Sequence, residues 1–155
     1  MEAVKKDWTL SQLAMMTGLS DRMLRNHLAS GVLQGTKING KWYFTTDQIN
    51  AFTKHPAVKP GIVAKQNAEV YDFLFKEEKA RTGACMIIDF PQVDKQEVCQ
   101  YFIDRIRKES MEEYFSFAFD GESDVPRVIL RGATVDVLRM VNGFMQKMGV
   151  GQSEE

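Results

Sequence analysis

Apolar side chains in the first third of the chain recur at helical spacing, and cap residues mark where each helix begins. Thr9-Leu10-Ser11-Gln12 has the spacing of a capping box, which predicts a helix from Leu10 to Gly18. Ser20 has the side chain of a helix cap and predicts a second helix that ends at Gly31. Two short helices joined by a tight glycine turn are typical of a helix-turn-helix.

The next apolar residues alternate, as they do in strands. An Asn-Gly pair at 39–40 favours a type I′ turn and predicts a hairpin with strands over about 36–38 and 41–44. The alternation predicts that Trp42 and Phe44 face the core and that Tyr43 faces outward. A second capping box, Thr45-Thr46-Asp47-Gln48, then predicts a third helix.

Beyond a stretch at 54–61 that contains two prolines and a glycine, helical and strand patterns follow one another. The predicted elements are a helix at 62–81, a strand at 84–90, a helix at 94–109, strands at 114–119 and 127–131, and a helix at 134–148. This order predicts an α+β sheet with helices on one side, ferredoxin-like but without the final strand. The missing strand leaves one sheet edge open, which dimerisation would cover.

The chain therefore divides into four expected parts. These are a winged helix-turn-helix domain at 1–54, a linker at 55–61, an α+β dimerisation or sensor domain at 62–150 and a disordered tail at 151–155. The expected fold class is α+β, with a small α-β-α-β-β-α second domain. Whether the helix at 62–81 covers the sheet of its own chain or pairs with its twin in a dimer stays open.

Composition and charge narrow the class of protein. The 155 residues are 44% hydrophobic and 26% charged, which is typical of a globular chain. No run of about 18 apolar residues and no signal-peptide pattern occurs, so we expect a cytoplasmic protein that does not bind membranes. Residues 1–60 carry eight Lys or Arg against four acidic residues, a net charge of +4, whereas residues 61–155 carry a net charge of −5. This split predicts that only the first part approaches a polyanion.

The second predicted helix presents a polar face when Leu24 is directed inward. The residues that then point outward are Ser20, Asp21, Arg22, Arg25 and Asn26. Arg22, Arg25 and Asn26 share one side of the helix and would enter a major groove together. There Arg pairs with guanine or holds phosphate, and Asn pairs with adenine. The simpler alternative, a solvated helix face, stays open.

Two lysines, Lys37 and Lys41, flank the predicted hairpin turn. A basic hairpin directly after a recognition helix can act as a wing, because it contacts the phosphate backbone or a minor groove while the helix lies in the major groove. Tyr43, directed outward from the second strand, is a further candidate phosphate contact. The sequence thus predicts double-stranded DNA as the partner of this part of the chain.

The order of these motifs resembles the winged helix-turn-helix of the MerR superfamily and of phage excisionases. The resemblance covers residues 8–53 and rests on Thr-Leu-x-x-Leu-Ala, Thr-Gly-Leu-Ser, Arg-x-Leu-Arg, a glycine before the wing, the aromatic wing strand and an Asp-x-Ile helix. It implies that the second helix and the wing bind DNA, through Arg22, Arg25, Lys37, Lys41 and Tyr43. Asn26-His27 stands where MerR regulators usually have Tyr-Tyr, so the chain is more similar to the excisionase branch.

Candidate chemistry elsewhere in the chain is sparse. Cys85 and Cys99 lack CxxC spacing and a neighbouring histidine, so we expect free, buried thiols and no metal site. Asp89 and Asp94 have no nucleophile or histidine near them in sequence, and His27 is expected to pack rather than to bind a ligand. No phosphate-binding loop or nucleophile motif occurs. We therefore expect no catalytic activity and no cofactor.

Three functions are consistent with these patterns. The first is a sequence-specific transcriptional regulator that dimerises through its C-terminal domain. The second is an excisionase-like architectural protein that binds DNA as cooperating monomers in recombination. The third is a regulator whose C-terminal domain senses a small molecule or a partner protein.

Overall fold

The computed structural model describes residues 7–76, 83–112, 114–120 and 125–149. Within these ranges the chain is a mixed α+β protein with six helices and two three-stranded antiparallel sheets, so the expected α+β class is confirmed. The tail expected at 151–155 and the end of the helix expected at 62–81 lie outside the described residues. No helix in the described ranges has the length and apolar character needed to cross a membrane.

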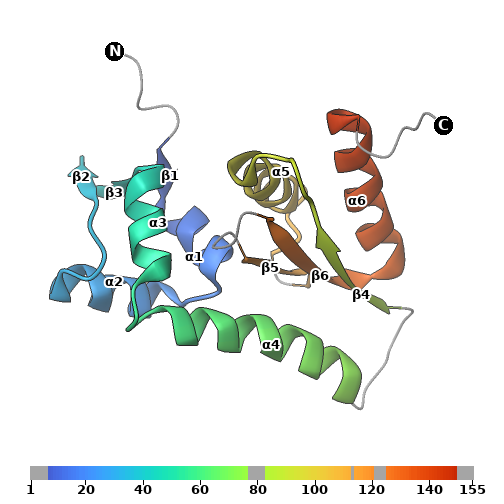
Figure 1. Ribbon diagram of the computed structural model, residues 1–155, viewed down its shortest axis with the longest axis horizontal. Coiled ribbons are helices and arrows are strands. Elements are labelled where there is room, and N and C mark those ends of the chain that lie inside the picture. The colour runs from blue at the N-terminus through green and yellow to red at the C-terminus, as the bar shows by residue number, and fades with distance from the viewer. Residues whose placement is uncertain (1–6, 77–82, 113, 121–124, 150–155) are drawn as a thin grey trace.

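The first half of the structure contains three helices and a small sheet (Figure 1). Its elements are β1 (Trp8–Thr9), α1 (Leu10–Thr17), α2 (Asp21–Ser30), β2 (Thr36–Ile38), β3 (Lys41–Phe44) and α3 (Thr46–Lys54). Both predicted capping boxes form, and in the first of them the Thr9 N–H donates to Gln12 Oε1 at 2.9 Å. Gly18 and Gly31 follow α1 and α2 with left-handed backbone, at φ values of 78° and 86°. The predicted helices and hairpin are confirmed, whereas β1 was not expected.

The hairpin has the turn that its Asn-Gly pair predicts. Asn39 and Gly40 both have positive φ, at 51° and 81°, as a type I′ turn requires. The strand order is β1-β3-β2, so β3 is the central strand. A Cβ atom on Gly35, just before β2, would lie 2.5 Å from the ring of Phe44. The backbone therefore passes so close to this buried ring that only glycine fits there.

The second half of the structure contains the other three helices and the larger sheet. Its elements are α4 (Lys59–Phe75), β4 (Gly83–Asp89), α5 (Lys95–Lys108), β5 (Ser116–Asp120), β6 (Arg127–Ala133) and α6 (Thr134–Met148). The order and type of these elements agree with the prediction. The strands are arranged β4-β6-β5, and both pairings are antiparallel. β4 is therefore an edge strand whose outer edge pairs with no described strand.

Helices cover both faces of this sheet, which corrects the expectation of helices on one side. On one face, Phe117 of β5 stacks on Phe102 of α5 with ring centroids 6.1 Å apart. On the other face, Arg131 of β6 forms an ion pair of 2.8 Å with Glu69 of α4. Figure 1 shows α4 running along the side of the sheet away from α5 and α6. The physical reason is that the sheet also has apolar residues on its second face, such as Ile129, which α4 helps to bury.

The stretch expected as a linker, 55–61, is largely structured. α4 begins inside it at Lys59, and the Val58 N–H donates to the His55 carbonyl oxygen at 2.9 Å in the preceding turn. Pro60 lies in the first turn of α4, where its missing N–H removes no helical hydrogen bond. One hydrophobic cluster contains buried side chains from both halves of the chain, and α1 packs against β5. The two halves thus share a buried interface.

Candidate nucleic-acid interface

The second helix, α2, is anchored by one fully buried residue and exposes much of its remaining surface. Leu24 has no exposed surface. The Ser20 hydroxyl caps the helix by accepting from the Met23 N–H at 3.1 Å, and it remains at the surface. The other predicted contacts on this helix are all exposed, namely Asp21, Arg22, Arg25 and Asn26. The five residues selected from helical spacing therefore lie together on an accessible face.

Arg25 forms an ion pair within the helix. Its Nε donates to Asp21 Oδ2, one turn earlier, at 2.7 Å. The two side chains are 59% and 62% exposed, so the pair contributes little to the stability of the fold. Because the contact with Asp21 uses only the Nε–H, the N–H groups of the two terminal nitrogens can donate to another partner. The geometry thus favours Asp21 as a residue that orients Arg25.

Contacts at both ends of α2 fix its position. At the turn before α2, the Thr17 hydroxyl donates to the Leu13 carbonyl oxygen at 2.8 Å and accepts from the Leu19 N–H at 3.2 Å. Near the other end, the half-buried His27 ring packs edge-on against Phe52 of α3, with ring centroids 5.3 Å apart. His27 therefore packs against the core, as predicted.

The hairpin register separates the two wing lysines. Lys37 lies opposite Trp42, and its Nζ is 5.7 Å from the centre of the indole ring. Lys41 lies opposite Ile38 and shares its face of the hairpin with Tyr43, because alternate residues of a strand point the same way. Both lysines are exposed, yet they leave the hairpin on opposite faces. A DNA surface would therefore meet only one of them directly.

Burial of the wing aromatic residues differs in part from the predicted alternation. Phe44 is fully buried, as expected. Trp42 is half-buried, packs against the core cluster and stacks on Phe44 with ring centroids 6.5 Å apart, so its inward orientation is also confirmed. Tyr43 is half-buried too, which corrects the expectation of a fully outward tyrosine. The reason is that β3 has a strand on each side, so Tyr43 lies between Thr9 of β1 and Thr36 of β2. Tyr43 keeps only part of its side chain accessible for a phosphate contact.

The two aspartates that the sequence singled out in the second half, Asp89 and Asp94, have partners within the fold. Asp94 caps α5 by accepting from the Glu97 N–H at 3.0 Å. Arg127 donates two hydrogen bonds to Asp89 and holds the pKa of that carboxyl below its usual value. Cys99 is a buried free thiol, as predicted, whereas the free thiol Cys85 is only half-buried. Within the part of the chain that the structure describes, no group of three or more His, Cys, Asp or Glu is arranged to hold a metal ion.

Comparison of the chain with protein-family models, curated proteins and solved structures finds no match. The assignment of function therefore depends on the arrangement of residues in this chain. The arrangement with the clearest chemistry is the polar α2 face followed by the basic hairpin, both of which lie in the positively charged part of the sequence.

One feature of the structure has no signature in the sequence patterns. Trp8 forms part of the short strand β1, is 2% exposed and lines a cavity between the two halves of the chain. Its Nε1 is buried without a hydrogen-bond partner among the described residues. The only available signal was an apolar residue just before the Thr9 cap, a position that usually packs against the helix it precedes. A cavity between elements distant in sequence leaves no periodic trace.

Proposed function

We propose that this chain is a sequence-specific DNA-binding regulator of the winged helix-turn-helix type. The observation that carries the proposal is the exposed polar face of α2, on which Asp21 orients Arg25. In this proposal α2 enters the major groove, where Arg22 and Arg25 contact guanine or phosphate and Asn26 contacts adenine. The β2–β3 hairpin lies on the adjacent backbone, where Lys41 and Tyr43 contact it directly and Lys37, on the opposite face of the hairpin, adds positive charge nearby.

We infer that the second half is a ferredoxin-like unit without its last strand. The strand order β4-β6-β5 supports this inference, as do a helix between the first two strands and another after the third. In a complete unit the last strand would pair with the outer edge of β4, which pairs with no strand among the described residues. In this protein a second copy of the chain covers that edge.

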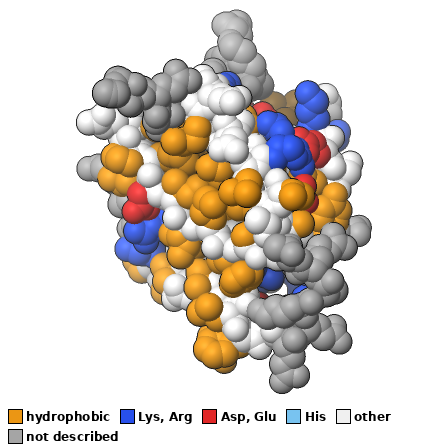
Figure 2. Space-filling view, turned by 90° about the vertical axis from the view of Figure 1, so that its right-hand side faces the viewer, with side chains coloured by type: hydrophobic (Ala, Val, Ile, Leu, Met, Phe, Trp, Pro, Cys, Tyr) orange, Lys and Arg blue, Asp and Glu red, His pale blue; other side chains and the backbone are white. Residues whose placement is uncertain are grey.

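The surface around β4 supports a homodimer. Figure 2 views the side of the molecule that carries β4, α6 and the end of α4, and hydrophobic side chains gather on it. The exposed large apolar residues of these elements are Tyr71, Leu74, Phe75, Ile87, Val135 and Leu138, at 46% to 72% exposure. Monomeric proteins rarely expose a large apolar patch, and an antiparallel strand edge can pair with its own copy about a twofold axis. Such a dimer would present two α2 helices to half-sites about one helical turn apart.

An excisionase-like architectural role is the second candidate. It is favoured by Asn26-His27, which follows the arginine motif where MerR regulators usually carry two tyrosines. In this role the chain would bind neighbouring sites as cooperating monomers and would bend or cluster DNA. The mass of the protein in solution separates this role from a dimeric regulator.

The test is selection of binding sites from random duplex DNA with the full chain, combined with light scattering. A dimeric regulator should enrich palindromic half-sites and have the mass of a dimer. Direct repeats bound by a monomer would instead support the architectural role. Salt-sensitive binding without any enriched sequence would contradict base recognition by α2.

The wing makes a separate prediction about salt. Lys41→Ala should weaken binding to all DNA sequences and reduce the slope of log affinity against log salt by about 0.9, the value for one lost phosphate contact. Lys37→Ala should reduce the slope less, because Lys37 lies over Trp42 on the opposite face of the hairpin. Lys108→Ala, at an exposed lysine that ends α5, is the matched control. Equal slopes in the wild type and both wing variants would contradict a backbone contact by the hairpin.

The dimer makes a prediction about mass. Ile87, on edge strand β4, is 52% exposed, and Ile87→Glu should make the chain monomeric because each copy would bring a carboxylate to an apolar contact. The monomeric variant should also bind a palindromic site more weakly than the wild-type dimer does. Tyr114→Glu is the matched control, since Tyr114 is 59% exposed and precedes β5 at the opposite edge of the sheet. A dimeric mass for Ile87→Glu would exclude the β4 interface.

A further inference from the structure

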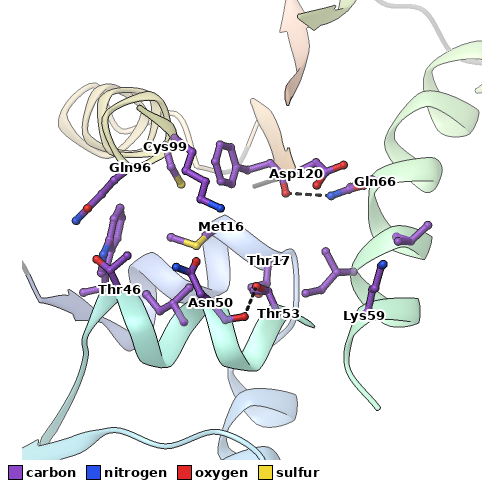
Figure 3. Close-up of a pocket in the computed structure, with 16 residues that line it drawn as sticks. Met16, Thr17, Thr46, Asn50, Thr53, Lys59, Gln66, Gln96, Cys99 and Asp120 are labelled. Carbon is purple, nitrogen blue, oxygen red and sulfur yellow. Dashed lines mark hydrogen bonds between the residues drawn. The ribbon is translucent and has the colours of Figure 1, made fainter. Parts of the chain in front are cut away.

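A cavity of about 90 Å³ lies between the two halves of the chain (Figure 3). Its wall comes from β1, α1 and α3 of the first half and from α4, α5 and β5 of the second. Figure 3 shows Cys99 of α5 directed toward Met16 of α1, with Asn50 and Thr53 of α3 nearby. A molecule bound there would touch both halves at once.

Much of the cavity wall is apolar. Its apolar side chains include Met16, Ile49, Ile62 and Phe119. Burial raises the pKa of the Cys99 thiol well above its usual value, so this group is also uncharged at neutral pH. Such a wall suits the hydrocarbon part of a small molecule.

Trp8 provides an unused hydrogen-bond donor. The residue is 2% exposed and lines the cavity, and its Nε1 has no hydrogen-bond partner in the described part of the chain. A buried indole N–H usually finds an acceptor, and leaving it unpaired is unfavourable. Because the indole nitrogen can only donate, any partner that it gains is an acceptor, such as the oxygen of a ligand or of a water molecule.

Charge and volume narrow the class of ligand. The charged side chains of the wall, Lys59, Lys95 and Asp120, each interact with another group of the chain, so the donor on Trp8 is what favours a carboxylate over an ammonium ion. An apolar cavity of about 150 Å³ accepts benzene. A cavity of about 90 Å³ is smaller, so the part of a ligand that it encloses has at most about the six non-hydrogen atoms of benzene, a number that butyrate shares.

We propose that this cavity binds a small aliphatic carboxylate, with the hydrocarbon chain between Met16 and Cys99 and a carboxylate oxygen accepting from Trp8 Nε1. The regulatory consequence rests on the proposed function. α1 and α3 line the cavity and also support α2, in the case of α3 through the contact between Phe52 and His27. A ligand that changes how the halves pack thus changes how the two α2 helices of a dimer fit their half-sites.

The test uses propionate, butyrate and hexanoate as probes, with n-butylammonium as a control of similar size and opposite charge. Binding to the full chain is followed by saturation-transfer NMR of the probe, up to about 20 mM because molecules this small bind weakly. Butyrate should give a saturable signal and n-butylammonium should not. Absence of a saturable signal from all three carboxylates would overturn the proposal.

Two variants assign the signal to the cavity. Trp8→Phe should weaken butyrate binding about tenfold, the loss expected for one charge-assisted hydrogen bond, whereas Trp42→Phe, which changes the other tryptophan, should not. Cys99→Leu adds side-chain volume to the wall without altering Trp8 and should also remove the signal. Circular dichroism identifies the variants that keep their fold. Unchanged butyrate binding in a folded Trp8→Phe or Cys99→Leu chain would overturn the assignment.

A DNA titration separates this proposal from the proposed function. Saturating butyrate should change affinity for the selected site by about fivefold or more in the wild type and not in Trp8→Phe. Unchanged affinity with butyrate bound would overturn the regulatory consequence. Butyrate binding by a chain that never binds DNA would contradict the DNA-binding proposal alone.

Discussion

Arg25→Ala should lower affinity for the selected DNA site by about 5- to 150-fold, which corresponds to the ~1–3 kcal/mol of a bidentate arginine contact. Arg25 is exposed on α2, and Asp21 holds it through Nε at 2.7 Å, which leaves the N–H groups of the terminal nitrogens to donate to DNA. The fold should be unaffected, because this exposed ion pair contributes at most about 0.5 kcal/mol. Polarisation titrations against the selected and a random duplex measure the loss.

Two further variants define what Arg25 does. Arg25→Lys keeps the positive charge but loses the planar arrangement of donors. If Arg25 contacts a base, this variant should bind random DNA more tightly than Arg25→Ala does, but it should not regain the preference for the selected site. Recovery of both would indicate a phosphate contact. Arg107→Ala, at an exposed arginine of α5 in the second half, is the matched control and should bind as the wild type does. Unchanged affinity of Arg25→Ala for the selected site would contradict the recognition role of α2.

The first half could be predicted closely because its signals are local. Each capping box spans four residues, and Asn39-Gly40 determines its own turn through the positive φ that both residues tolerate. The opposite orientation of Lys37 and Lys41 was also available from the sequence, since a two-residue turn fixes which residues lie opposite one another. Strand β1 has two residues, which is too short for a periodic signal.

The second half shows which structural features the sequence patterns predict and which they do not. They predicted the type and order of its elements, because those depend on periodicity within each segment. They did not predict that the halves share a core, because Pro60 suggests a break although it fits the first turn of α4. α4 packs on the sheet of its own chain through Glu69, while Leu74 and Phe75 at its end stay exposed. The first alternative, in which this helix covers the sheet of its own chain, is thus observed, and pairing of its exposed end in a dimer stays a prediction.

The two candidate sites also differ in how far the sequence predicts them. Helical spacing is enough to place Arg22, Arg25 and Asn26 on one face, so the α2 face could be predicted without tertiary contacts. The cavity beside Trp8 could not, because its wall joins segments from both halves of the chain and depends on how they pack. Surface sites on one element can be inferred from a sequence, and sites between elements require the fold.

Phe102→Ala should destabilise the whole chain by about 3–5 kcal/mol, the usual range for removing a buried phenyl ring. Phe102 has no exposed surface, and its ring lies 5.4 Å from that of Phe144 and 6.1 Å from that of Phe117. Since domains of this size are stable by about 5–15 kcal/mol, the loss is a large fraction of the total. In urea the midpoint should fall by about 1.5 M or more, for a slope near 2 kcal/mol per M.

The tryptophans extend this prediction to the interface between the halves. Trp8 and Trp42 both lie in the first half, so their fluorescence reports its unfolding, whereas circular dichroism reports the helices of both halves. Because one hydrophobic cluster includes residues of both halves, the two signals should have the same midpoint and shift together in Phe102→Ala. Tyr114→Ala, at an exposed aromatic residue, is the control and should shift neither. A fluorescence midpoint that stays at its wild-type value while the dichroism midpoint falls would mean that the first half unfolds independently. In that case a ligand between the halves would have no rigid path to α2.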